Sequence, residues 1–155
     1  MKKTTGNLIT MGLEGKFDVI IHGCNCYHKM GAGIAREIKK RIPSAYSVDV
    51  NSSIWGDWKK LGSYTATKIT NRHEGYLIVV NAYTQYEHWN KTDVNEDSIR
   101  KVFKLIASDF KYKRIGYPLI GCGLAGGDWS RISLIIDKEL KGLDHTLVNY
   151  DSNAK

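Results

Sequence analysis

Two short glycine-rich segments contain the residues of this sequence that are best suited to bind a ligand. They span residues 30–34 and 121–127, and each follows an apolar run and precedes a helix-like segment. Because glycine has no Cβ, its backbone N–H groups can approach a ligand closely, and a helix N-terminus attracts phosphate. One such segment is typical of a tight turn, but two in one small chain predict a ligand with two phosphates held between them.

Known phosphate-binding patterns fit these segments only in part. Residues 121–126 match the Gly-x-Gly-x-x-Gly pattern of dinucleotide-binding proteins, but only one more strand is expected after them. The first segment has Arg36 where that pattern needs its third glycine, and neither segment continues into the Gly-Lys-Ser/Thr of a Walker loop. A cysteine phosphatase would have an arginine six residues after Cys122, where this chain has Asp128.

Histidines and cysteines alternate just before the first segment, at His22, Cys24, Cys26 and His28. The alternation suggests zinc, but successive side chains on one face of a strand lie about 7 Å apart, too far to meet on one ion. We therefore predict no metal site. The chain has 3 cysteines, an odd number that does not form a disulfide framework and favours a reducing, cytoplasmic setting.

Strands and helices alternate along the chain and position the two segments. Strands are predicted, from apolar runs between turn signals, over residues 17–22, 63–69, 76–82, 115–120 and 145–150, with a short further strand over 4–9. Helices are predicted, from apolar residues at helical spacing, over residues 34–42, 99–110 and 129–140. The first helix should stop at Pro43, Asp93 and Glu96 resemble a capping box before the second, and Asp128 is expected to cap the third.

This alternation predicts an α/β fold, because helices that connect parallel strands cover both faces of a sheet. We expect a three-layer α/β/α sandwich with a central mixed, mainly parallel sheet, formed as a single domain over residues 1–155. Ligands of such sheets bind beyond the carboxyl ends of the strands. Both glycine segments follow strands and should therefore lie at that edge.

The chain carries a formal net charge of +7, from 23 Lys and Arg against 16 Asp and Glu. This balance reflects either ordinary surface lysines or a phosphorylated or polyanionic partner. No apolar run approaches the roughly 20 residues that cross a bilayer, and the polar N-terminus does not resemble an export signal. We expect a cytoplasmic protein that does not engage a membrane.

Residues 19–35 and 118–129 resemble the two most characteristic stretches of the macro domain, the ADP-ribose-binding fold, and the similarity extends over most of the chain. The sequence Asn-Ala-Tyr-Thr-Gln at 81–85 adds to the resemblance. Within that family the chain is similar to the branch with yeast-type ADP-ribose-1''-phosphate phosphatases and terminal ADP-ribose protein glycohydrolase, which includes small bacterial and bacteriophage proteins. The resemblance implies ADP-ribose or a derivative as the ligand and no cofactor.

The resemblance also implies roles for individual residues. Asn25 matches an asparagine that hydrogen-bonds the distal ribose, and Tyr150 matches an aromatic position beside adenine. Asn7, followed by Leu8, stands where many macro domains use an aspartate to bind the adenine amino group, and its side-chain oxygen could accept the same bond. The two loops that pass the diphosphate and distal ribose are matched by Gly31, Ala32, Gly33, Ile34, Gly121, Cys122, Gly123, Leu124 and Ala125.

Several activities are compatible with these residues. The lysine and aspartate of the glycohydrolase mechanism are replaced by Asn81 and Ala125, which argues against that route. The first hypothesis is a hydrolase that removes phosphate from ADP-ribose 1''-phosphate. The alternatives are a hydrolase that removes ADP-ribose from esters or ADP-ribosylated macromolecules, and a reader without turnover.

The phosphatase hypothesis predicts three catalytic residues. Asn25 would bind the distal ribose, His22 (or alternatively His28 in the first loop) would transfer a proton, and Asp128 would position the attacking water. Two of them have a plain structural interpretation as well. His22 is also typical of a packed, hydrogen-bonded core histidine, and Asp128 is typical of a helix cap.

Overall fold

The computed structural model describes residues 1–87, 94–123 and 125–155. In this part of the chain six strands form one sheet in the order β1-β6-β5-β2-β4-β3. Neighbouring strands are parallel except β3 and β4, which form an antiparallel hairpin. The strands are β1 (Lys2–Gly6), β2 (Val19–Cys24), β3 (Tyr64–Thr70), β4 (Tyr76–Tyr83), β5 (Ile115–Tyr117) and β6 (His145–Tyr150).

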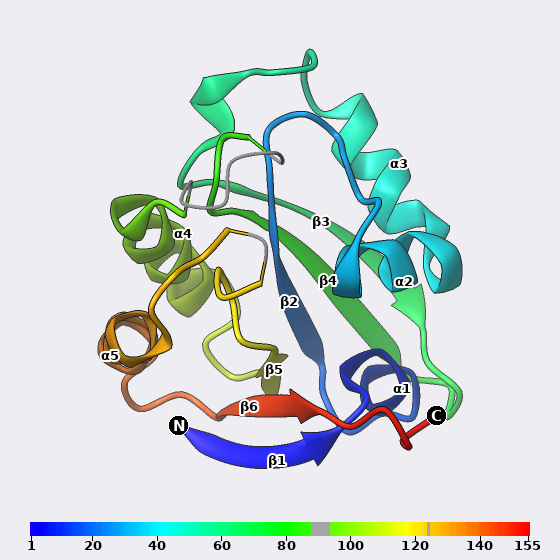
Figure 1. The fold of residues 1–155 in the computed structure, drawn as a ribbon. Coiled ribbons are helices and arrows are strands. Elements are labelled where there is room, and N and C mark those ends of the chain that lie inside the picture. The colour runs from blue at the N-terminus through cyan, green and yellow to red at the C-terminus, as the bar shows by residue number, and fades with distance from the viewer. Residues whose placement is uncertain (88–93, 124) are drawn as a thin grey trace.

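Helices cover both faces of this sheet (Figure 1). On one face lie α4 (Glu96–Asp109) and α5 (Trp129–Glu139). On the other lie α1 (Leu8–Leu13), α2 (Gly33–Arg41) and α3 (Pro43–Asn51). A short 3-10 helix, η1 (Trp58–Lys60), precedes β3. The predicted three-layer α/β/α sandwich with a mixed, mainly parallel sheet is confirmed.

Strand β2 is buried on both faces. Val19 and Ile21 pack into the core under α4 and α5, whereas Ile20 packs into the core under α1, α2 and α3. This burial explains why the apolar run of β2 does not alternate with polar residues, as expected for a central parallel strand.

The chain leaves the centre of the sheet in opposite directions after β2 and after β5. From β2 it passes through α2 and α3 to β3 and β4 on one side, and from β5 it passes through α5 to β6 on the other. Because β2 and β5 are parallel neighbours, the loops that follow them start side by side. Open α/β sheets bind their ligands at such a point.

The N-terminal segment differs from its prediction. The short strand predicted over 4–9 is present with other bounds: β1 spans Lys2–Gly6, and α1 begins at Leu8. Asn7 is the N-cap of α1, and its Oδ1 accepts a hydrogen bond from Thr10 N at 3.1 Å. An asparagine is one of the preferred N-cap residues because its side chain satisfies a backbone N–H of the first turn.

The two prolines also shift the predicted boundaries. Pro43 ends α2, as predicted, but it is also the first residue of α3, a helix that was not predicted. Proline fits the first turn of a helix because no N–H is needed there. The strand predicted over 115–120 stops at Tyr117, since Pro118 has no N–H to donate within a sheet. Residues 118–120 turn out of the sheet instead.

One of the two predicted helix N-caps differs from the structure, and the other agrees with it. Helix α4 is capped by Asn95, whose Oδ1 accepts from Ser98 N at 2.9 Å. The predicted capping-box partner, Asp93, lies outside the described residues. The prediction for the last helix is confirmed, because Asp128 is the N-cap of α5 and accepts from Ser130 N at 2.9 Å. None of the helices described is long and apolar enough to span a bilayer.

Candidate functional site

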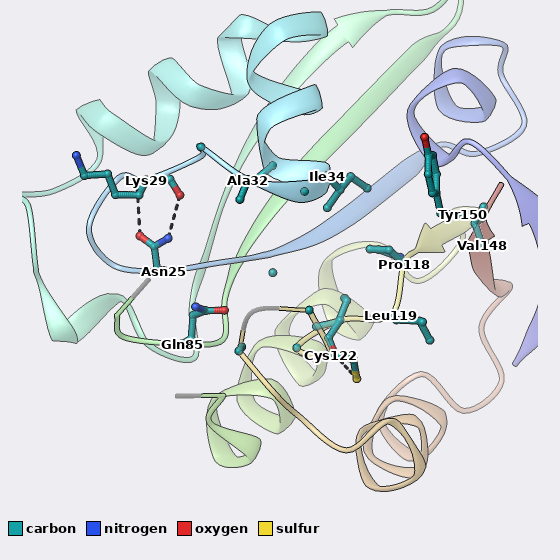
Figure 2. Close-up of a pocket in the computed structure, with 18 residues that line it drawn as sticks. Asn25, Lys29, Ala32, Ile34, Gln85, Pro118, Leu119, Cys122, Val148 and Tyr150 are labelled. Carbon is teal, nitrogen blue, oxygen red and sulfur yellow. Dashed lines mark hydrogen bonds between the residues drawn. The ribbon is translucent and has the colours of Figure 1, made fainter. Parts of the chain in front are cut away.

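The two glycine segments border a single cleft at the carboxyl end of the sheet. Loop one (residues 25–32) follows β2, loop two (residues 118–128) follows β5, and the cleft between them has a volume of about 700 Å³ (Figure 2). The structure brings most of the predicted ligand-binding residues to this cleft. They are Asn25, Gly31, Ala32, Gly33, Ile34, Gly121, Cys122, Gly123, Ala125 and Tyr150. Leu124, also predicted, lies outside the described residues.

Asn25 holds loop one in shape. Its Oδ1 accepts hydrogen bonds from Tyr27 N at 2.9 Å and Lys29 N at 3.3 Å, and its Nδ2 donates to Lys29 O at 2.9 Å. Figure 2 shows the carboxamide turned toward the backbone of Lys29, whose side chain extends away from the cleft. One of the two amide N–H groups of Asn25 is therefore used within loop one, and the other remains for a ligand.

Three glycines leave open space beside the backbone of the cleft. A Cβ at Gly31, Gly33 or Gly123 would meet no heavy atom within 4 Å. Gly33 also has φ of 56°, a left-handed conformation that other residues rarely adopt. The protein itself does not need a small residue at Gly31 or Gly123 for packing. A ligand that approaches the backbone supplies a reason for glycine at both positions.

The two helix N-termini at the cleft differ. The N-cap of α2 is Ala32, which makes no side-chain cap hydrogen bond, so the first N–H groups of α2 have no capping side chain. The N-cap of α5 is Asp128, and hydrogen bonds from Ser130 lower the pKa of this carboxyl group. A carboxylate already occupies the α5 N-terminus. The α2 N-terminus is therefore the better phosphate site.

Loop two is closed by its own backbone. Gly127 N donates to Gly121 O at 2.7 Å, and the Cys122 thiol donates to Ile120 O at 3.5 Å. Burial raises the pKa of the Cys122 thiol, so this cysteine is a thiol rather than a thiolate near neutral pH. Cys122 therefore contributes to the surface of the cleft and is not an activated nucleophile.

A second cleft of about 400 Å³ continues the first toward α1. The two clefts share Gly33, Ile34, Pro118, Val148 and Tyr150. The predicted residues Asn7 and Leu8 line this second cleft. Tyr150 is 74% exposed at the end of β6 and borders both clefts, so a flat ring can lie against it.

His22 lies in the interior and lines neither cleft. Its Nε2 donates to Asn81 Oδ1 at 2.6 Å, because the Asn81 amide nitrogen is itself a donor to Ala45 O and Thr65 Oγ1. Burial lowers the pKa of His22 to about 4, although the bond with Asn81 opposes the shift. Of its two sequence interpretations, the structure favours the packed core histidine.

Asp128 is likewise placed as a structural residue. Its carboxylate caps α5, it is exposed, and it is absent from the described lining of either cleft. Of the three predicted catalytic residues, only Asn25 reaches the cleft. His28 of loop one also lies outside the lining, with φ of 57° and with its buried Nε2 lacking a hydrogen-bond partner.

The alternating histidines and cysteines do not form a metal site within the described part of the chain, where no group of three potential ligands gathers. One pair of these side chains nevertheless lies closer together than the spacing along a strand predicts. Cys24 Sγ lies 3.4 Å from His22 Nε2, because both side chains turn toward each other on the same face of β2. Both are fully or nearly buried in the core.

Several residues of the two clefts were not singled out from the sequence as ligand contacts. They are Gly23, Lys29, Ala35, Gln85, Pro118, Leu119, Ile120 and Val148 in the first cleft, and Arg36 and Glu37 in the second. Gln85 had a signal, since it ends the Asn-Ala-Tyr-Thr-Gln stretch. The apolar residues had none, because their part in the cleft depends on where β5 ends.

A family model of the macro domain matches residues 21–136 of this chain. A protein of Enterobacteria phage T4, described as an uncharacterized 17.5 kDa protein in the tk-vs intergenic region, is 31% identical over 162 residues, with 97% of each chain covered.

Solved structures share the fold. The macrodomain of Mycobacterium tuberculosis DarG is 19% identical with a TM-score of 0.71, and the match covers 97% of this chain and 98% of that one. Thermosipho africanus DarTG in complex with ADP-ribose is 20% identical with a TM-score of 0.69, covering 90% of this chain and 39% of that one. A macrodomain protein from Streptomyces coelicolor is 24% identical with a TM-score of 0.61, covering 87% and 88%.

Proposed function

This chain belongs to the macro domain family, and from that premise we propose that it binds ADP-ribose in the two joined clefts. The diphosphate lies between loop one and loop two, the adenine lies near Tyr150, and the distal ribose lies near Asn25. The Thermosipho africanus structure with ADP-ribose and a Trypanosoma brucei macrodomain in complex with ADP support this choice of ligand.

One observation carries the proposal: both loops expose glycine backbone to the same cleft. Gly31 and Gly33 on one side and Gly123 on the other have open space where a Cβ would be. The α2 N-terminus beside Gly33 has no side-chain cap. Backbone N–H groups and a helix N-terminus together favour an anionic group such as a diphosphate.

The activity we propose is removal of phosphate from ADP-ribose 1''-phosphate, as in the branch with yeast-type phosphatases. Water attacks the phosphorus atom, the bond from phosphorus to the anomeric oxygen breaks, and that oxygen takes up a proton. Backbone N–H groups of the two loops stabilise the phosphoryl oxygens. The free amide N–H of Asn25 holds the distal ribose or the attacking water.

The proton for the leaving oxygen can come from the substrate. No carboxylate or imidazole belongs to the described lining of the 700 Å³ cleft. A phosphate monoester has a second pKa near 6 and therefore carries its own proton in mildly acidic solution. A reaction that needs no protein acid fits this cleft better than cleavage of a glycosidic bond, which requires a general acid.

The lysine-adduct mechanism of the glycohydrolase finds no support here. Asn81 stands in place of the lysine and is fully buried, bonded to His22, Ala45 and Thr65. Ala125 stands in place of the aspartate and has no acidic group. Hydrolysis of ADP-ribose esters and binding without turnover remain as outcomes that the experiment separates.

The experiment follows phosphate release from ADP-ribose 1''-phosphate and measures ADP-ribose affinity in the same preparation. We expect release, with a rate that rises as pH falls toward 6, and loss of both activities by about tenfold or more in Gly123→Ala, because its methyl group enters the diphosphate site. Asn51→Ala, an exposed change on α3, is the control and should match the wild type. Binding without release would exclude the phosphatase, and absence of ADP-ribose binding would exclude the whole proposal.

A further inference from the structure

The side-chain oxygen of Asn7 is already used within the protein. It accepts from Thr10 N at 3.1 Å and lies 3.5 Å from Arg41 NH1, which also donates to Thr10 Oγ1 at 2.9 Å. Because both neighbours are donors, the amide oxygen must face them, and its two lone pairs are occupied. Asn7 therefore offers only N–H donors to the cleft. The exocyclic amino group of adenine is also a donor, so the two groups do not match.

Glu37 supplies an acceptor in the same cleft. It is on α2, one turn after Gly33, and it is the one carboxylate among the described residues that line the 400 Å³ cleft with Asn7 and Tyr150. Its side chain is 49% exposed. The Arg36 Nε lies 3.9 Å from Glu37 Oε1, beyond hydrogen-bond distance, and an ion pair of this kind is worth little in solvent. The carboxylate is therefore available to a ligand.

From this arrangement we infer that Glu37, and not Asn7, accepts the hydrogen bond from the exocyclic amino group of the base and makes the site selective for adenine. The inference rests on the proposed binding of ADP-ribose. Asn7 then donates from Nδ2 to N7 of the base, which is an acceptor in both adenine and hypoxanthine, and Tyr150 covers the flat face. The Asn7 amide thus donates to the ring nitrogen of adenine, and the Glu37 carboxylate accepts from its amino group.

A carboxylate that only lies near the ligand would have the opposite effect on affinity. ADP-ribose carries a negatively charged diphosphate, so a bystander Glu37 would repel it, and neutralisation would tighten binding. A carboxylate that accepts a hydrogen bond from the base strengthens binding, and its neutralisation weakens it. The sign of the change separates the two cases.

The test compares ADP-ribose with its hypoxanthine counterpart, inosine diphosphate ribose, which has a carbonyl oxygen in place of the amino group. We expect the wild type to prefer ADP-ribose by about tenfold, since a charged acceptor facing that carbonyl is unfavourable. Glu37→Gln should weaken ADP-ribose binding and bring the preference close to one, because an amide can serve either base. Glu139→Gln on α5 removes the same charge outside both clefts and should leave the preference unchanged.

The outcomes separate this inference from the proposed function. If the wild type binds ADP-ribose, but Glu37→Gln binds it equally well or more tightly with the preference intact, the role of Glu37 is excluded and ADP-ribose binding stands. If the wild type binds neither compound, the proposed function fails and the inference fails with it. Weaker binding together with a lost preference supports Glu37 as the residue that selects adenine.

Discussion

The two loops that border the cleft are both rich in glycine, but they are built differently. Loop one is shaped by a side chain, since Asn25 bonds the backbone at Tyr27 and Lys29, and its glycine at 31 faces open space. Loop two is shaped by its backbone. A Cβ at Gly127 would lie 2.6 Å from Gly121 O, closer than such atoms approach. Gly31 of loop one therefore leaves open space, whereas Gly127 of loop two is required by close packing.

The largest expected change in the free energy of unfolding comes from β2, the strand that leads into loop one. His22 is buried in its neutral form, and burial lowers its pKa from 6.5 to about 4. The folded state therefore binds the proton less readily than the unfolded state. The stability that the neutral histidine provides is present above pH 6.5 and is lost as pH falls toward 4, by about 3 kcal/mol.

Urea unfolding between pH 7 and pH 4 measures this effect. In His22→Gln the free energy of unfolding should fall by about 3 kcal/mol less between pH 7 and pH 4 than in the wild type, while Asn51→Ala, an exposed change on α3, should follow the wild type. Equal acid sensitivity in His22→Gln and the wild type would show that His22 is not the buried neutral group described here. The acid dependence of the free energy of unfolding would then not come from the strand beneath loop one.

The next largest effect is expected in loop two. Gly127→Ala places a methyl group against Gly121 O and Ile132, and the backbone carbonyl cannot move away without opening the loop. We expect a loss of about 1–3 kcal/mol in the free energy of unfolding, together with weaker ADP-ribose binding. Urea unfolding and calorimetric titration check both. Unchanged stability would mean that loop two tolerates a side chain as loop one does.

The smallest effect on stability is expected at Gly31. Its Cβ would meet nothing, so Gly31→Ala should change the free energy of unfolding by no more than about 0.5 kcal/mol. Binding of ADP-ribose should nevertheless fall about tenfold or more, because the methyl group takes space beside the diphosphate. If this variant binds ADP-ribose as tightly as the wild type, loop one does not contact the ligand as proposed.

The layers of the fold and the glycine backbone of the site were predictable from the sequence. Periodicity predicted the strands and the amphipathic helices α2, α4 and α5, because burial on one or two faces leaves a repeating apolar pattern. It missed α1, which has 6 residues, and α3, which is as long as α2 but has no apolar face of helical period. The glycine segments predicted the cleft because a ligand that approaches backbone excludes side chains.

The positions of the polar side chains that were predicted to be catalytic could not be read from the sequence. His22 and Asn25 are three residues apart, and both are polar at the end of a strand. The pleat of β2 sends His22 into the core under α3, and only Asn25, just beyond the strand, reaches the cleft. Asp128 precedes a helix, and the sequence could not tell whether its carboxylate would be used by that helix or by a ligand.

The sequence by itself determined the α/β sandwich, the two glycine loops at strand ends and the family, since these depend on periodicity and on local backbone requirements. Only the tertiary structure decided which polar groups remain free for a ligand. Asn7 and Asp128 use their oxygens to cap helices, and the buried His22 is bonded to Asn81. Helix α2 brings Glu37 to the cleft that Asn7 and Tyr150 also line. The sequence shows which chemical groups a side chain carries, but its hydrogen-bond partners come from residues far away along the chain.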